Sequence, residues 1–231
     1  MDEKILKIQH TLKKELDENR YHHTLGVMYT SASMAMRYDV DVQKALYAGL
    51  LHDCAKCIPS DKKIRLCEKY GLPVSSVEKE NPSLLHARLG AYLAHEKYGV
   101  KDEEIICAIE SHTTGRPGMS MLEKIVYIAD YIEPGRNKAA DLPRVRKLAF
   151  EDLDECMYEI LKDTLEYLEY LDEFVDMYDV SCGLNPSLQY QIDSNFLPDG
   201  WRSYMARAVK DKFKKPVINA GNYRDPKIVE K

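Results

Sequence analysis

A histidine and an aspartate stand side by side, as His52 and Asp53, at the end of an apolar stretch that begins at Ala45. The residues before the pair are mainly alanine and leucine, which favour a helix with a buried face. Burying an imidazole and a carboxylate costs free energy unless each has a partner, and a metal ion can satisfy both. The pair alone leaves two interpretations open: metal ligands, or a core histidine beside an aspartate that caps a turn.

More imidazoles and another carboxylate occupy similar positions, at the ends of expected helices beside apolar stripes. The full set is His23, His52, Asp53, His86, His112 and Asp130. This mixture of nitrogen and oxygen donors suits Fe, Mn, Co, Ni or Zn better than Mg alone. Such a set is large enough for one or two metal ions, and Asp53 is the expected bridge between two. A metal pair would clamp a phosphoryl group and activate water as a nucleophile.

Helical periodicity accounts for the elements that must position these residues. The expected helices span residues 3–18, 21–38, 41–55, 60–71, 83–98, 102–112 and 120–133, then a short helix from Pro143 and a long one from Glu151 into the 170s. Asp41, Ser60 and Asp102 are expected N-caps, and Ser120 begins a capping box. Because no strand pattern occurs before residue 178, we predict an all-α helical bundle. His10, His22 and His95 are expected on its surface.

The composition indicates a protein of the cytoplasm. The 231 residues are 45% hydrophobic and 31% charged, with a formal net charge of −5, which argues against nucleic acid as a bulk partner. The charged N-terminus lacks a signal core, and no apolar run reaches the length of a membrane span.

The six cysteines are expected to be reduced. Cys54-x-x-Cys57 has redox spacing, but a helix precedes it where a thioredoxin motif would follow a strand. A homodimer is left open.

Five short sequence words occur in a fixed order around the candidate ligands. They are Arg20-Tyr21-His22-His23-Thr24-Leu25-Gly26-Val27, His52-Asp53-Cys54-Ala55-Lys56, Leu85-His86, His112-Thr113-Thr114-Gly115, and Ala129-Asp130-Tyr131-Ile132-Glu133-Pro134 followed by Arg136. Over about residues 1–170 the chain resembles the YqeK-type branch of the HD-domain phosphohydrolases. The resemblance implies an HD-domain helical bundle that hydrolyses dinucleoside tetraphosphates symmetrically, diadenosine tetraphosphate giving two ADP, with bound iron or a similar metal.

The resemblance also implies a division of roles among the candidate ligands. The primary metal ligands would be His23, His52, Asp53 and Asp130. His86 and His112 would complete a second metal site or contact the phosphates. A metal-bound water would then attack a phosphorus atom, and Asp53 would be the most sensitive catalytic position.

Cations and a loop near these words are expected to contact the substrate. Lys56 can reach phosphate oxygens as a point charge, and Arg136 can hold phosphate with two hydrogen bonds. Both would stabilise charge that develops on the phosphoryl oxygens. Arg20 could contact phosphate or a neighbouring helix. The Thr113-Thr114-Gly115 loop offers hydroxyls and backbone N–H groups beside His112.

Four other functions remain open for the same ligand set. A mononucleotide phosphatase or a cyclic-dinucleotide phosphodiesterase would use similar phosphate chemistry. Some HD-domain proteins look like di-iron oxygenases, and a non-catalytic nucleotide-binding regulator is a further class. Cations at the site favour phosphate chemistry over oxygen chemistry, and a complete ligand set argues against a regulator.

The C-terminal region differs from the helical part, so we predict an HD domain at residues 1–178 and an irregular or mixed appendage at 179–231. Residues 176–183 and 214–221 resemble strand ends of flavin-binding barrels of the old yellow enzyme type. A strand is expected from Pro216 and a short helix at 200–212. Such a fragment is too short to close a barrel, so neither FMN binding nor an independent function is expected.

Overall fold

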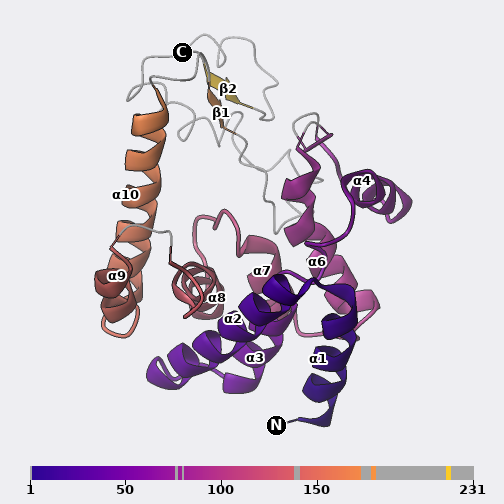
Figure 1. The fold of residues 1–231 in the computed structure, drawn as a ribbon, viewed down its shortest axis with the longest axis horizontal. Coiled ribbons are helices and arrows are strands. Elements are labelled where there is room, and N and C mark those ends of the chain that lie inside the picture. The colour runs from indigo at the N-terminus through magenta and orange to yellow at the C-terminus, as the bar shows by residue number, and fades with distance from the viewer. Residues whose placement is uncertain are drawn as a thin grey trace. The chain divides into compact units, whose positions relative to one another are not determined.

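The computed structural model describes residues 2–75, 78–79, 81–137, 141–172, 178–180 and 217–219, with side chains described as far as residue 164. The chain divides into two compact units, Met1–Ile160 and Leu161–Lys231. Figure 1 shows the helices: α1 (Glu3–Glu15), α2 (Glu18–Arg37), α3 (Val42–Leu51), α4 (Ser60–Lys69), the 3₁₀ turn η1 (Pro82–Leu84), α6 (Leu85–Glu96), α7 (Glu103–Ser111), α8 (Met121–Ile132), α9 (Leu142–Leu148) and α10 (Leu153–Asp172). The predicted helical bundle is therefore confirmed.

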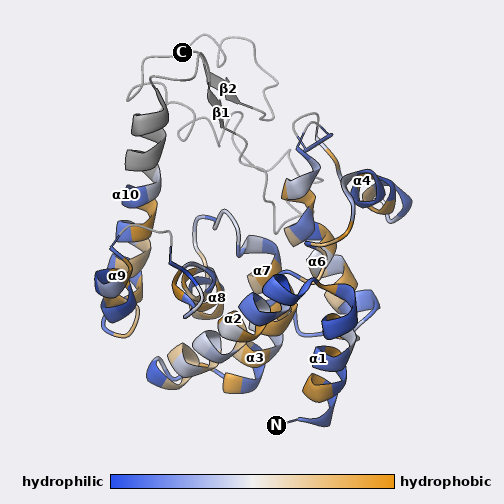
Figure 2. Cartoon of the chain, viewed as in Figure 1, coloured by the Kyte–Doolittle hydropathy of each residue, from blue (hydrophilic) through white to orange (hydrophobic). Residues whose placement is uncertain are grey.

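The core of the first unit lies between α2, α3, α7 and α8, which pack against one another. In Figure 2 hydrophobic colour runs along α3 and along parts of α7 and α8. Leu50, Ile109 and Ile125 are fully buried there, and burying a side chain of this size is worth ~1.5–3 kcal/mol. Helices α2 and α3 approach closely because position 49 is glycine: a Cβ on Gly49 would lie 2.8 Å from Cα of Met28. This rigid core supports the helix ends that carry the polar residues.

The first helix boundary differs from the prediction. A break was expected at Asn19-Arg20, but α1 ends at Glu15 and α2 begins at Glu18. Asp17 is the N-cap of α2, and its carboxylate accepts a hydrogen bond from the Arg20 N–H at 2.9 Å. An aspartate at an N-cap satisfies a free N–H of the first turn, and this outweighs the weak helix preference of asparagine. Arg20 therefore belongs to the first turn of α2.

The helix that leads to the His-Asp pair is also shorter than expected. Helix α3 ends at Leu51, not near Ala55, and tighter three-residue turns follow. Cys54 N–H donates to the carbonyl of Leu51 at 3.1 Å, and Lys56 N–H donates to that of Asp53 at 2.9 Å.

The remaining helix ends follow the expected caps, with one exception. Asp41 and Asp102 each accept hydrogen bonds from first-turn N–H groups, and the capping box of Ser120 is complete. Ser60, however, is the first residue of α4 and not its cap, because Pro59 occupies the N-cap position. Gly71 closes α4 with a φ of 68°, which favours glycine.

The second unit contains a pair of short strands among its described residues. Strand β1 (Tyr178–Val180) and strand β2 (Val217–Asn219) are parallel, with Tyr178 opposite Val217. The strand expected from Pro216 is thus present, whereas the helix expected at 200–212 lies outside the described residues. The resemblance to a flavin barrel gains no support from so short a pair. The domain boundary at residue 178 stays a prediction.

Candidate metal centre

The predicted ligands come from five helices and meet near one point. His23 lies in the second turn of α2, His52 and Asp53 follow α3, His86 lies in the first turn of α6, His112 follows α7, and Asp130 lies in the last turn of α8. Four of the six are buried: His52 is 0% exposed, His86 1%, Asp53 2% and His112 3%. The structure therefore brings together all of the residues predicted as ligands.

His23, His52 and Asp130 form one group, called here the His23 group. The Nε2 atoms of the two histidines are 3.3 Å apart, and Nε2 of His23 is 3.0 Å from Oδ1 of Asp130. Oδ2 of Asp53 faces this group, at 3.8 Å from Nε2 of His23 and 3.5 Å from Nε2 of His52. Three side chains and one oxygen of Asp53 thus surround a single small volume.

His86 and His112 form a second group, called here the His86 group. Their Nε2 atoms are 3.3 Å apart. The other carboxylate oxygen of Asp53, Oδ1, is 3.3 Å from Nε2 of His86 and 3.5 Å from that of His112. Asp53 therefore presents one oxygen to each group, which is the arrangement expected of a bridging carboxylate.

The outward ring nitrogens determine which tautomer each histidine adopts. In three of the histidines Nδ1 faces the backbone carbonyl three residues earlier: His52 that of Gly49 at 2.7 Å, His86 that of Ser83 at 2.6 Å and His112 that of Ile109 at 2.7 Å. A carbonyl oxygen only accepts, so each Nδ1 carries a proton, and in the neutral imidazole that binds a metal Nε2 offers a lone pair. The lone pairs therefore converge on the shared volume.

This donor set fits a divalent metal ion. Several nitrogen lone pairs and carboxylate oxygens that face one another repel unless a cation lies among them. In addition, Oδ1 of Asp53 is buried and accepts no hydrogen bond within the described residues. Backbone partners on Nδ1 are the usual outer support of metal-bound histidines. The residues present could therefore hold a metal in each group, with Asp53 shared.

The pKa directions give the protonation states that metal binding needs. Burial alone would raise the pKa of Asp53, but the imidazoles of His52 and His112 outweigh it and hold that pKa well below its usual range. Asp130 behaves alike, with His23 lowering its pKa most strongly against the effect of burial. Burial, followed by repulsion from His112, lowers the pKa of His86 to about 3. Both aspartates are thus anionic and His86 is neutral near pH 7.

The predicted cations surround the ligands. Arg20 donates to Oδ2 of Asp53 at 2.6 Å, and Arg136 donates to Oδ1 of Asp130 at 2.6 Å. The Lys56 ammonium lies 3.1 Å from Nε2 of His86, and burial lowers its pKa. Positive charge therefore borders the centre on both sides, as an anionic substrate would need.

The predicted loop is only partly brought to the centre. The Thr113 hydroxyl lies 3.2 Å from Nε2 of His86 and 3.1 Å from that of His112. Thr114 is exposed and contacts the carbonyl of Gly115, whose φ of 64° forms a turn. Among the histidines expected outside the centre, His10 is exposed and the His22 side chain is 69% exposed, whereas His95 is partly exposed with a 39% exposed side chain.

One residue at the centre had no predicted role. Glu133 is 3% exposed, and its Oε1 lies 3.1 Å from Nδ1 of His23. It is the C-cap residue of α8, three positions after Asp130. That spacing is the signal that could have identified Glu133 from the sequence.

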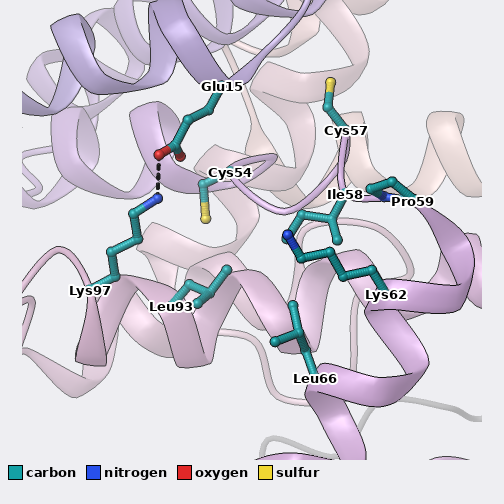
Figure 3. Close-up of a pocket in the computed structure, with 9 residues that line it drawn as sticks. All are labelled: Glu15, Cys54, Cys57, Ile58, Pro59, Lys62, Leu66, Leu93 and Lys97. Carbon is teal, nitrogen blue, oxygen red and sulfur yellow. Dashed lines mark hydrogen bonds and ion pairs between the residues drawn. The ribbon is translucent and has the colours of Figure 1, made fainter.

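Two pockets lie near these elements. Figure 3 shows one of about 430 Å³ beside Cys54 and Cys57, with an ion pair of 2.5 Å between Glu15 and Lys97 at its edge. In that view the two sulfur atoms point in different directions, and both cysteines are free thiols. Burial raises the pKa of Cys54 to about 12, which does not favour a reactive thiolate. The second pocket, also about 430 Å³, is lined by His22, His23 and Glu133 among others.

Known proteins are similar to this chain in sequence and in fold. The model of the HD domain matches residues 20–135, and the chain belongs to the HD-domain family. It is 43% identical over 157 residues to "Bis(5'-nucleosyl)-tetraphosphatase, symmetrical" of Bacillus subtilis, a match that covers 68% of this chain and 83% of that protein. The Staphylococcus aureus protein of the same name is 36% identical over 180 residues, which cover 77% and 92% of the two chains.

A solved structure supports the fold directly. It is the crystal structure of a predicted HD superfamily hydrolase involved in NAD metabolism from Clostridium acetobutylicum, 44% identical with a TM-score of 0.68. The match covers 71% of this chain and 86% of that one. In the described part of this chain, no helix is both long and apolar enough to cross a membrane.

Proposed function

We propose that this protein is a metal-dependent hydrolase that cleaves dinucleoside tetraphosphates symmetrically, so that diadenosine tetraphosphate gives two ADP. The observation that supports metal-dependent hydrolysis is the position of Asp53, whose two oxygens face two groups of candidate metal ligands. The substrate class rests on the relatives named symmetrical tetraphosphatases, which are matched over 83% and 92% of their lengths.

The ligand assignment is part of the proposal. His23, His52, Asp130 and one oxygen of Asp53 would hold one divalent ion. His86 and His112, with the other oxygen of Asp53, would hold a second ion or contact a phosphate. A bound divalent metal supplies a Lewis acid and lowers the pKa of water enough for attack on phosphorus.

The cations of the chain would bind and orient the polyphosphate. Lys56 reaches the His86 group, while Arg20 and Arg136 border the His23 group. Each can donate to phosphoryl oxygens, whose charge grows in the transition state. The Thr113 hydroxyl can donate at the same place, and Thr114 and Gly115 remain proposed contacts further along the loop. Asp53, Lys56 and Arg136 are the proposed catalytic residues.

The proposal also includes the identity of the metal. Iron is the proposed metal, with Mn, Co, Ni and Zn as alternatives that the same donors accept. A homodimer, the lack of a nucleic acid partner and a cytoplasmic location stay predictions.

Product analysis tests the proposed reaction. Metal-loaded protein is incubated with diadenosine tetraphosphate, and the nucleotides are separated by ion-exchange chromatography. Two ADP with no AMP or ATP is the expected result, whereas AMP plus ATP would overturn symmetric cleavage. Asp61→Asn serves as a control for Asp53→Asn, because Asp61 is an exposed carboxylate paired only with Arg65 in the described structure.

The rival functions predict different products. A mononucleotide phosphatase would release inorganic phosphate from AMP, and a cyclic-dinucleotide phosphodiesterase would open a cyclic dinucleotide. A di-iron oxygenase would consume oxygen, which an oxygen electrode measures. The three cations at the centre favour phosphate over oxygen chemistry.

A further inference from the structure

His23 differs from the other three histidines in what its outer nitrogen contacts. Their Nδ1 atoms face neutral backbone carbonyls, but Nδ1 of His23 faces a carboxylate, Oε1 of Glu133 at 3.1 Å. The Glu133 side chain is 5% exposed, and its other oxygen accepts the N–H of Gly135 at 2.6 Å. Glu133 is thus fixed between its own loop and the imidazole of His23.

Two glycines leave the space that this carboxylate fills. A Cβ on Gly26 would lie 2.5 Å from Oε2 of Glu133, and a Cβ on Gly135 would lie 3.0 Å from both carboxylate oxygens. Gly26 is in the interior of α2, where glycine costs roughly 0.5–1 kcal/mol relative to alanine. Glycine at position 26 therefore makes α2 less stable but leaves room for the side chain of Glu133.

Among the described residues, the carboxylate of Glu133 pairs with a histidine and not with a lysine or arginine. Within the described residues, no lysine or arginine side chain pairs with the carboxylate of Glu133, and its ion pair is with His23. A buried carboxylate without a cationic partner is costly. Its position is explained if it acts on His23.

We propose that Glu133 is a positioning residue that holds His23 with Nε2 directed at a divalent metal in the His23 group. The inference rests on the proposed ligand set. A carboxylate on Nδ1 fixes the ring plane and the tautomer and makes Nε2 a stronger donor, so the ion bound by His23 is held more tightly. Glu133 itself touches neither the metal nor the substrate.

Metal affinity of the apoprotein tests this role without substrate. The apoprotein is titrated with Co²⁺ against a competing chelator, and its thermal unfolding is followed by circular dichroism. Glu133→Ala should weaken the tightest Co²⁺ site about 10- to 100-fold. Glu133→Gln, which can still accept from Nδ1 of His23, should recover part of that loss. An affinity of folded Glu133→Ala within twofold of the wild type would overturn the proposal.

Glu159→Gln is a matched control for a buried carboxylate. Glu159 lies on α10, which carries none of the proposed ligands; its side chain is 8% exposed and pairs at 2.7 Å with Arg144 of α9. Glu159→Gln should lower the unfolding temperature but leave the Co²⁺ affinity within twofold of the wild type. Loss of Co²⁺ affinity in this control as large as in Glu133→Ala would assign the effect to general destabilisation and overturn the proposal.

Gly26→Ala tests the same role while Glu133 and every ligand remain in place. The added methyl would lie 2.5 Å from Oε2 of Glu133 and would displace this carboxylate from His23, while alanine itself favours the helix. Co²⁺ affinity should fall about tenfold without a lower unfolding temperature of the apoprotein. Unchanged affinity would contradict the role of Glu133.

The result separates this inference from the proposed reaction. If Co²⁺ affinity depends on Glu133 but diadenosine tetraphosphate is not cleaved, the positioning role stands and the proposed substrate is wrong. If the substrate is cleaved but Co²⁺ affinity does not depend on Glu133, the proposed reaction stands and the positioning role is wrong. A wild-type apoprotein that takes up no Co²⁺ would overturn both.

Discussion

The two groups on either side of Asp53 use the same imidazole chemistry but differ in charge. The His23 group includes the carboxylate of Asp130 and is backed by that of Glu133, with Arg20 and Arg136 bound to the aspartates. In the described structure, the His86 group receives only the shared oxygen of Asp53 as an anion, and the Lys56 ammonium lies 3.1 Å from its Nε2.

The difference in charge indicates that the two groups have different roles. Anionic ligands and a carboxylate-backed histidine favour tight metal binding, whereas a neutral pair of imidazoles beside an ammonium favours a weaker metal site or an anionic phosphate. We therefore expect the His23 group to bind the first ion. The His86 group should fill second, or act on the phosphate that is being cleaved.

Removal of the shared carboxylate should have the largest effect. Asp53→Asn leaves the shape of the side chain but removes the charge that both groups use. A metal-activated step is worth several kcal/mol, so hydrolysis should fall at least about 10³-fold, with loss of bound metal. Chromatographic product analysis and metal content by mass spectrometry measure both. Activity near that of Asp61→Asn would refute a shared role of Asp53.

Substitution of one histidine in each group should separate the two sides. His52 and His112 are 0% and 3% exposed, so the variants His52→Gln and His112→Gln are matched in burial. His52→Gln should weaken the tightest Co²⁺ site at least about 100-fold, because a ligand is lost and not only its support. His112→Gln should leave that site within a few-fold. Equal losses in the two folded variants would contradict the expected order of filling.

Loss of the ammonium beside the His86 group should slow the reaction without removing the first metal. Lys56→Met keeps the length of the side chain but not its charge, so kcat should fall about 10²-fold, as for loss of one preorganised charge donor. Lys44→Met is the control, because Lys44 pairs with Asp102 and Glu104, in the cap and first turn of α7. If Lys56→Met raises only KM, Lys56 binds the substrate but does not stabilise the transition state.

The sequence predicts the ligands better than the contacts around them. Four histidines and two aspartates at helix ends are visible in the spacing, since each follows or begins an apolar stripe. The direction of Nδ1 is not visible, because it depends on how each helix ends. Glu133 shows this best: its partner His23 is 110 positions away, and only the packing of α2 against α8 brings them together.

Helix boundaries were the weaker part of the prediction for a similar reason. Helix α3 ends at Leu51, where His52 contacts the carbonyl of Gly49 and Asp53 accepts a hydrogen bond from the distant Arg20. The start of α2 depends on Asp17 rather than on the residues that looked like a break. Periodicity identifies the helices, but their exact ends depend on capping contacts that periodicity does not show.

The smallest expected effect concerns the scaffold of the His86 group. Glu110, on α7 before His112, is largely buried, and burial raises its pKa to about 7, only partly offset by Arg88 and Arg116. The pKa of glutamate in an unfolded chain is near 4.5. The folded state therefore loses stability as the pH rises from 4.5 through 7, because the buried carboxyl must ionise.

Glu110→Gln should remove this penalty. At pH 8 the variant should be more stable than the wild type by at most about 3 kcal/mol, seen as an unfolding temperature a few degrees higher. At pH 4.5 or below the two should unfold at nearly the same temperature. Because the proposed ligand that follows α7 is His112, which belongs to the His86 group, the affinity of the tightest Co²⁺ site should not change. A weaker tight site in Glu110→Gln would show that the two sides of Asp53 are coupled through the scaffold as well as through Asp53.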